Sequence, residues 1–182
     1  MATVSGFAHA QAERSTALLP AGARNWSYER FVRDHGARLV QSLSLISRDR
    51  ELAADAAQDA LIQLYRHWDE MDQVRDPVAW LYRVAINRSN DYRRRLKRSA
   101  RLFERLITTM SDEDWVAPEV ATSQLVAIFR ALPLRQRTAA TLYYLADFPV
   151  VEVARVMNIS EGAVNRHLHR AREALRETME AD

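Results

Sequence analysis

Residues 150–177 read VVEVARVMNISEGAVNRHLHRAREALRE, and this stretch carries the clearest structural signal in the chain. Its apolar residues recur every three or four positions on both sides of Asn158, which predicts two helices joined by a tight turn. Asparagine tolerates the left-handed backbone of such a turn, and Ser160 followed by Glu161 is a favourable helix start. The residues expected to be buried are Val153, Ala154, Met157, Val164, Leu168 and Ala171. The stretch therefore predicts a helix-turn-helix.

In a helix-turn-helix the second helix enters the major groove of duplex DNA with its N-terminal end foremost. There, the amide of Asn165 can bond adenine, and the guanidinium of Arg166 can bond guanine. An ordinary pair of helices inside a helical core would give the same apolar pattern, and this alternative stays open. The residues that we expect at a DNA duplex are Ser160, Glu161, Asn165, Arg166, His169, Arg170 and Arg172.

The residues ahead of this motif divide the chain. A helical period ends at Pro133, and a second helix is expected over 138–145. Residues 107–122 are polar and acidic and contain proline, which is typical of a linker. We therefore predict a C-terminal helical domain over 123–182 and a flexible acidic linker over 107–122.

The N-terminal part predicts a second helical domain over 26–106, after a disordered tail over 1–25. Two helical periods are followed by a predicted loop over 69–77, and a third helix should start after Pro77 and continue beyond Arg95. The whole chain has only 4 glycines and 5 prolines and is rich in helix-forming residues. The expected fold class is all-α, with two small helical domains.

The third helix combines aromatic, amide and basic side chains in PVAWLYRVAINRSNDYRRR, residues 77–95. Rings stack on unpaired bases, amides bond exposed base edges and arginines follow the backbone, so this mixture suits single-stranded or locally opened DNA. The alternative is that Trp80 and Tyr92 are core residues and the arginines are merely solvated. Helical spacing places on one face Trp80, Arg83, Asn87, Asp91 and Arg94.

Charge is unevenly distributed, although the net charge is only +2. Over residues 83–101, basic side chains outnumber acidic ones by eight to one. Over residues 51–72, acidic side chains outnumber basic ones by six to one. This division suggests a polyanion as the partner of the first surface and a basic protein surface as the partner of the second. Ordinary solvated helix faces are the alternative.

Several classes of function are disfavoured by the composition. The chain has no cysteine, and His167 and His169 would point in different directions on a helix, so we expect no metal site. No Glu-x-x-His pair supports a di-iron bundle enzyme, and we expect no catalytic residue and no cofactor. No apolar run reaches the roughly 18 residues that cross a membrane, and the first residues lack a signal-peptide pattern. We expect a cytoplasmic protein without a membrane partner.

Three stretches together resemble the bacterial sigma factors of the extracytoplasmic-function class, reduced to their second and fourth conserved regions. DRELAADAAQDALIQLYRHW, residues 49–68, resembles the helix that binds RNA polymerase. DPVAWLYRVAINRSNDYRRR, residues 76–95, resembles the helix that opens the −10 promoter element. ALPLRQRTAATLYYLADFPVVEVARVMNISEGAVNRHLHRAREAL, residues 131–175, resembles the region that reads the −35 element. The resemblance covers about residues 27–177.

The resemblance implies core RNA polymerase as the protein partner. The acidic helix face would meet the clamp helices of the β′ subunit, and apolar residues of the fourth region would receive the tip of the β flap. An anti-sigma factor is a further partner that the resemblance suggests, and the acidic linker would run through the RNA exit path. The polymerase-binding residues would be Asp55, Gln58, Asp59, Ile62, Leu142, Tyr143 and Leu145.

The resemblance also implies promoter DNA as a partner, both as a duplex and as a melted strand. The loop 69–76, with Asn87 at its base, would capture a base flipped from the non-template strand. The helix-turn-helix would read the −35 element. The residues at the −10 element would be Trp80, Arg83, Asn87, Arg88, Asp91 and Arg94.

The chain departs from the family pattern at several positions. A larger apolar residue is usual where Ala56 stands, and glutamate is usual at Asp59, so polymerase contact there is expected to differ. The recognition helix lacks the usual lysine and arginine and has Arg166 one position away, so its base preference should be its own.

Two hypotheses follow from the sequence. The first is a transcription initiation factor that binds core polymerase, directs it to the −10 and −35 elements and stabilises promoter melting. The second is a stand-alone helix-turn-helix regulator that binds duplex DNA and has no use for the third helix of the N-terminal domain.

Overall fold

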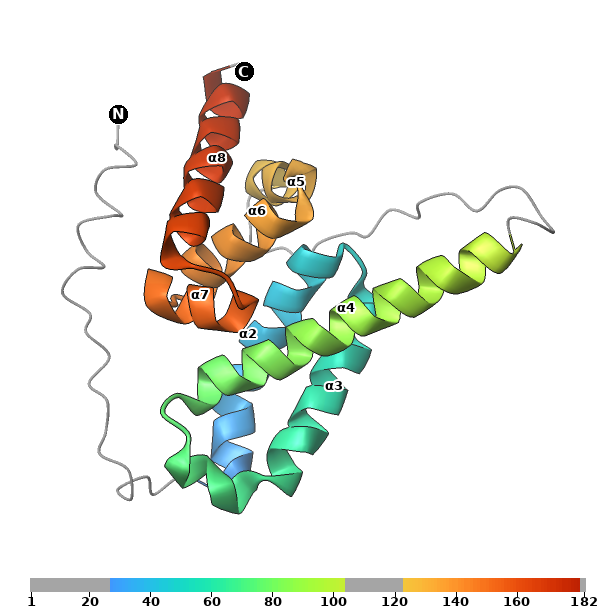
Figure 1. Ribbon diagram of the computed structural model, residues 1–182, viewed down its shortest axis with the longest axis vertical. Coiled ribbons are helices and arrows are strands. Elements are labelled where there is room, and N and C mark those ends of the chain that lie inside the picture. Colours follow the sequence, from blue (N-terminus) through green and yellow to red (C-terminus); the bar gives the residue numbers. More distant parts are fainter. Residues whose placement is uncertain (1–26, 104–122, 181–182) are drawn as a thin grey trace.

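The computed structural model describes residues 27–103 and 123–180, and the regular structure in these ranges is entirely helical (Figure 1). This agrees with the all-α expectation; the predicted tail over 1–25 and linker over 107–122 lie outside the described residues. The N-terminal part contains α2 (Tyr28–Ser47), α3 (Arg50–Arg66), the 3-10 helix η1 (Trp68–Gln73) and α4 (Pro77–Phe103). The C-terminal part contains α5 (Ser123–Ala131), α6 (Leu134–Ala140), the π-helical turn η2 (Thr141–Leu145), α7 (Val150–Met157) and α8 (Glu161–Glu180).

Local sequence explains where the N-terminal helices begin. The carboxylate of Asp49 accepts a hydrogen bond of 2.9 Å from the Leu52 amide at the start of α3. The carboxylate of Asp76 accepts one of 2.9 Å from the Ala79 amide, and Pro77 occupies the first helical position of α4. Each cap of this kind contributes about 1 kcal/mol. Because each capping carboxylate and the amide that it accepts from are three residues apart, the starts of α3 and α4 are encoded by local sequence.

The expectation of a loop over 69–77 is wrong for most of its length, because η1 occupies Trp68–Gln73. Met71 is buried in the core of the bundle. The ring of Trp68 makes edge contacts with the rings of Tyr28 and Phe31, with centroids 5.6 and 5.5 Å apart. These anchors come from α2, some 40 residues earlier, and the polar local sequence gives no sign of them.

Small residues line the inner face of α3, where that helix meets α2 and α4. Their size lets neighbouring helix axes approach closely. Ala56 is fully buried here, so this departure from the family pattern alters packing inside the bundle and not a contact with a partner. The alanines of α3 that are at most 1% exposed are Ala53, Ala56, Ala57 and Ala60, and fully buried leucines of the same core cluster are Leu39, Leu43, Leu64 and Leu81.

The helix expected over 138–145 is divided into an α-helical segment and a π-helical turn. The α-helical part, α6, begins earlier, at Leu134, and the chain then widens into the π-helical turn η2. In this turn the Ala146 amide bonds the Thr141 carbonyl oxygen at 3.0 Å, five residues back. A π turn inserts an extra residue, so side chains after it point elsewhere than a regular helix would place them.

The N- and C-terminal parts pack against each other (Figure 1). One cluster of buried hydrophobic residues contains members of both parts. The ring of Tyr82 on α4 meets the ring of Phe148, which precedes α7, edge to face with centroids 5.1 Å apart. The buried guanidinium of Arg137 on α6 reaches the carbonyl oxygen of Ile46 near the end of α2, at 2.9 and 3.1 Å. Sequence periodicity predicts two domains but gives no sign of this shared core.

Candidate nucleic-acid and protein-binding surfaces

The helix-turn-helix expected from the sequence is present in α7 and α8. Asn158 lies between them in the left-handed conformation, with φ 53° and ψ 51°. The hydroxyl of Ser160 accepts a hydrogen bond of 3.2 Å from the Ala163 amide at the start of α8. Five of the six predicted core positions are buried, whereas Met157 is only partly buried and its neighbour Val156 is buried.

The outer face of α8, called the α8 face below, consists of the residues predicted to meet duplex DNA. Besides the Ser160 hydroxyl, the side chains of His169 and Arg172 have partners within the helix. The ring of His169 lies 3.2 Å from the carboxylate of Glu173, and the Nε of Arg172 donates to the Leu168 carbonyl oxygen at 3.3 Å. The face therefore presents a basic surface at the N-terminal half of a long helix. Its exposed members are Ser160, Glu161, Asn165, Arg166, His169, Arg170 and Arg172.

His167 belongs to the opposite, inner side of α8. Its Nδ1 atom is buried and has no hydrogen-bond partner within the described part of the chain. Burial lowers the pKa of His167, and the positive charges of Arg135, Arg170 and Arg166 lower it further. The ring is therefore neutral at pH 7, and it takes no part in the basic face.

The third helix expected from the sequence is α4, and the residues predicted to meet DNA on it are exposed or half-buried. The α4 face is defined below as Trp80, Arg83, Asn87, Arg88, Asp91 and Arg94. Arg83, Asn87 and Arg94 are exposed. Trp80 is half-buried, and its ring meets that of His67 edge-on with centroids 6.3 Å apart. Arg88 is also half-buried. Tyr82, on the opposite side of α4, contacts Phe148 of the C-terminal part.

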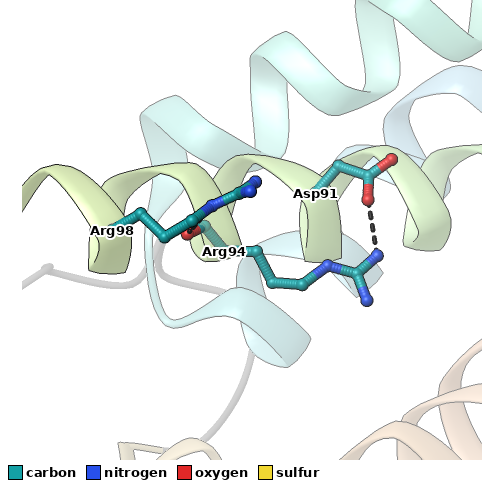
Figure 2. Close-up of polar contacts among 3 residues, drawn as sticks. All are labelled: Asp91, Arg94 and Arg98. Atoms are coloured by element: carbon teal, nitrogen blue, oxygen red, sulfur yellow. Dashed lines mark hydrogen bonds and ion pairs between the residues drawn. The ribbon is translucent and has the colours of Figure 1, made fainter.

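Asp91 and Arg94 form an ion pair on the α4 face, and Figure 2 shows how the arginine turns back along the helix to reach it. The Nη2 atom of Arg94 lies 2.5 Å from Oδ1 of Asp91. This hydrogen bond is the main cause that holds the pKa of Asp91 below its usual value, and the charges of the neighbouring arginines add to it. One turn later, the Nε of Arg98 donates to the Arg94 carbonyl oxygen at 3.3 Å. The acid thus orders one arginine of an otherwise cationic face.

The acidic surface expected on the second helix lies on α3. Asp55 and Gln58 are exposed, and Asp59 is half-buried. The hydroxyl of Tyr92, on α4, donates to Oδ2 of Asp59 at 2.6 Å. Ile62 is an apolar side chain 41% exposed at the end of this row.

Tyr65 extends the same surface and was missed by the sequence analysis. It is 65% exposed, the highest value among the large apolar side chains that the structure describes. Its ring meets that of Tyr28 edge to face, with centroids 5.1 Å apart. Its position three residues after Ile62 was a usable signal, because residues three apart share a helix face. The α3 face is defined below as Asp55, Gln58, Asp59, Ile62 and Tyr65.

The predicted protein-binding segment at η2 needs one correction. Leu142 has no exposed surface, because it belongs to the shared core, and it cannot touch a partner in this structure. Tyr143 and Leu145 are half-buried. The missed residue is Tyr144, which is 37% exposed and packs edge to face on Tyr143 with centroids 4.9 Å apart. The η2 patch is defined below as Tyr143, Tyr144 and Leu145.

Residues 27–103 and 123–180 contain neither a membrane-spanning helix nor a metal-binding cluster. None of the helices described there combines the length and the apolar character that crossing a bilayer requires. In the same ranges, no three acidic, histidine or cysteine side chains come together as a metal site would need.

Comparison with known families assigns both parts of the chain. Residues 31–99 match the family described as Sigma-70 region 2, and residues 122–175 match the family described as Sigma-70, region 4. The ECF RNA polymerase sigma factor SigW of Bacillus subtilis is 33% identical over 140 residues, covering 70% of this chain and 75% of that protein. SigM of the same organism is 29% identical over 152 residues, covering 82% and 90%.

Solved structures show the same fold. The sigma factor RpoE of Bartonella quintana, crystallised with the anti-sigma factor NepR, superposes with a TM-score of 0.66 at 18% identity, covering 85% of this chain and 99% of that one. CnrH, solved with the cytosolic domain of CnrY, superposes with a TM-score of 0.61 at 24% identity, covering 90% and 94%. With its two matched regions in sequence order and relatives aligned along most of its length, the chain belongs to the extracytoplasmic-function sigma factors of bacterial RNA polymerase.

Proposed function

We propose that this sigma factor binds core RNA polymerase in the cytoplasm, directs it to −10 and −35 promoter elements and stabilises the melted promoter. The observation that carries the proposal is the separation of three exposed surfaces on one chain: the basic α8 face, the mixed aromatic and basic α4 face, and the acidic α3 face. A stand-alone helix-turn-helix regulator would use only the first of these. The chain itself would perform no chemical step and would act through binding energy.

Recognition at the −35 element is assigned to the α8 face. Asn165 and Arg166 lie near the N-terminal end of the helix, the end that a recognition helix inserts into the major groove. Their amide and guanidinium groups match adenine and guanine edges, respectively. Arg170 lies one turn further along and, being exposed, suits a phosphate.

Strand opening at the −10 element is assigned to the α4 face. Extracting a base from a duplex costs a few kcal/mol, and stacking on an aromatic side chain returns about 1–3 kcal/mol per base. Trp80 supplies a ring, Arg83 a charge for the backbone and Asn87 an amide for the edge of a flipped base. The neighbouring segment η1 would form the other wall of a base-binding site.

Binding to core polymerase is assigned to two surfaces. The α3 face offers carboxylates and an apolar end, which suits basic and apolar residues of the β′ clamp helices. The η2 patch offers aromatic rings for the tip of the β flap. Leu142 would support this patch from the core and would not itself contact the flap.

The two regions must separate for one molecule to reach both DNA elements. Elements named −10 and −35 are centred about 25 base pairs apart, or about 85 Å at ~3.4 Å per base pair. A compact chain of this size measures only about 40 Å across. The residues between Phe103 and Ser123 permit separation, since extended chain spans about 3.4 Å per residue.

An anti-sigma factor is the further partner that we propose. Of the two solved structures described above, one contains the anti-sigma factor NepR and the other contains the cytosolic domain of CnrY. An inhibitor that covered the α3 face would block binding to core polymerase. An inhibitor that held the two regions together would prevent one molecule from reaching both promoter elements.

The proposal is tested by transcription in vitro with the purified chain, core polymerase and a library of promoter sequences. Initiation that depends on the added chain and selects a paired −35 and −10 sequence is the expected result. Initiation that does not respond to the chain, combined with tight binding of the chain alone to duplex DNA in gel shifts, would support the stand-alone regulator instead.

A further inference from the structure

One hydrogen bond connects the helix proposed to hold DNA with the helix proposed to hold polymerase. The hydroxyl of Tyr92, on α4, donates to Oδ2 of Asp59, on α3, at 2.6 Å. Both side chains are half-buried, and the Tyr92 ring packs against the core of the bundle. The bond is short and joins residues 33 positions apart, so it arises from the packing of the two helices and not from local sequence.

The electrostatic surroundings keep the Tyr92 hydroxyl protonated, so that it remains the donor of this bond. The hydrogen bond to Asp59 is the main cause that raises the pKa of Tyr92, followed by burial and by the negative charges of Asp59 and Asp55, with Arg88 opposing. The phenol is therefore protonated throughout the physiological range and donates to the carboxylate. An O–H···O⁻ bond of this kind is shorter and stronger than one between neutral groups.

The bond leaves the carboxylate with capacity for a second partner. An ionised carboxylate has two oxygens and about four acceptor positions, and the tyrosine hydroxyl uses one of them. Asp59 is half-exposed beside the exposed Asp55 and Gln58, so a basic side chain can still approach it. A side chain already fixed in one rotamer loses less conformational entropy on binding than a free one.

We propose that Tyr92 is a positioning residue for polymerase binding, which holds the Asp59 carboxylate in the orientation that a basic residue of the partner requires. This inference rests on the proposed function, in which Asp59 belongs to the polymerase-binding surface. This role differs from the two that the sequence of residues 77–95 suggests for Tyr92. Those two are stacking of its ring on DNA and a place in the core. The family pattern has glutamate at this position, and the side chain of Asp59 is one methylene shorter. The Tyr92 hydroxyl holds this shorter carboxylate in one orientation.

The test is the affinity of the full-length chain for core polymerase, with Tyr92→Phe as the variant. Phenylalanine keeps the ring and its packing but removes the donor. The dissociation constant should rise about fivefold to tenfold, while the level of transcription at saturating concentrations of the chain stays at that of the unchanged protein. A lower maximal level with unaltered affinity would overturn the inference, because it would place Tyr92 at the DNA.

A matched control is Tyr82→Phe on the same helix. The Tyr82 hydroxyl shares a hydrogen bond of 3.3 Å with the hydroxyl of Ser42, and both groups are buried. Its removal should lower the melting temperature without changing the affinity for polymerase. If Tyr92→Phe behaves in the same way, with a loss of stability and no loss of affinity, Tyr92 is merely structural and the inference fails.

A double variant distinguishes two claims: that the α3 face binds polymerase, and that Tyr92 positions Asp59 for this binding. Asp59→Ala should weaken polymerase binding, and adding Tyr92→Phe to it should cost nothing more, because the hydroxyl then has no carboxylate to position. If Asp59→Ala alone leaves the affinity unchanged, the assignment of the α3 face to polymerase is wrong. If Asp59→Ala weakens binding and Tyr92→Phe does not, only the positioning role is wrong.

Discussion

Arg137 shows how much a single side chain can contribute to the arrangement of the two regions. It is only 3% exposed, and in the hydrogen bonds that the structure describes it donates to backbone carbonyl oxygens. Two of these bonds go to Ile46 and others go to Leu132 and Arg130, at 2.9 to 3.2 Å. Burial is the main cause that lowers the pKa of Arg137 to about 10, so the group remains charged at neutral pH.

Replacing this arginine should destabilise the fold. Arg137→Met keeps most of the volume but leaves buried carbonyl oxygens without donors, and we expect the free energy of unfolding to fall by about 2–4 kcal/mol. Urea unfolding at pH 7 measures this. The exposed Arg135 provides a control, since Arg135→Met should change stability by less than about 0.5 kcal/mol. Equal stability of the two variants would contradict the role given to Arg137.

Asn87 is the residue whose side chain should read a base of the opened strand. Asn87→Ala should leave polymerase binding intact and reduce strand opening by about fivefold, because about 1 kcal/mol of hydrogen bonding to the flipped base is lost. Permanganate reactivity of thymines in the promoter reports the opening. Asn165→Ala removes an amide from region 4 and, at equal promoter occupancy, should leave the reactivity unchanged. Unreduced reactivity with Asn87→Ala would count against base capture at this site.

At the scale of the element, α4 has one face in the hydrophobic core and another face in solvent. Its inner face contributes Leu81 and Tyr82 to the core, and its outer face keeps Arg83 and Asn87 in solvent. Sequence periodicity predicted this division because neighbouring side chains on a helix are separated by a fixed angle. Contacts such as that between Tyr92 and Asp59 could not be predicted in this way, since they depend on how α3 lies against α4.

The α8 face allows base contacts and phosphate contacts to be separated. Arg166→Ala should relax the sequence preference at one position of the −35 element and cost about 1–3 kcal/mol on the preferred sequence. Arg170→Ala should weaken binding about equally on all sequences and reduce the slope of log affinity against log salt by about 1. Affinities of the holoenzyme for a set of −35 variants, measured at several salt concentrations, distinguish the two. The same pattern for both variants would contradict the assignment.

At the scale of the whole molecule, the shared core holds the two regions together in the free protein. Besides Arg137, the Nε of Arg38 donates to the Leu145 carbonyl oxygen at 2.6 Å, and the side chain of Arg48 donates to the carbonyl oxygen of Arg130. Leu145 belongs to the η2 patch, so part of one proposed polymerase-binding surface lies against α2. The proposed function requires that these contacts break.

The separation of the regions can be followed by energy transfer between two dyes. The chain has no cysteine, so Arg33→Cys on α2 and Arg176→Cys on α8 give two unique, exposed labelling positions. Transfer should be efficient in the free protein and should fall strongly when core polymerase and promoter are added. A pair within region 2, at Arg33 and Arg50, should not change. Constant transfer between the regions would contradict a separation on the promoter.

The sequence by itself determined the helical class, the helix-turn-helix and the residues of the α8 and α4 faces, because periodicity, caps and the Asn158 turn are local properties of the chain. Only the tertiary structure decided that η1 is a helix and that Leu142 is buried while Tyr144 is exposed. It also decided that Arg137 joins the two regions and that Tyr92 bonds Asp59. Each of these depends on residues distant in sequence meeting in one core, and a local pattern carries no information about which distant surface a side chain will meet.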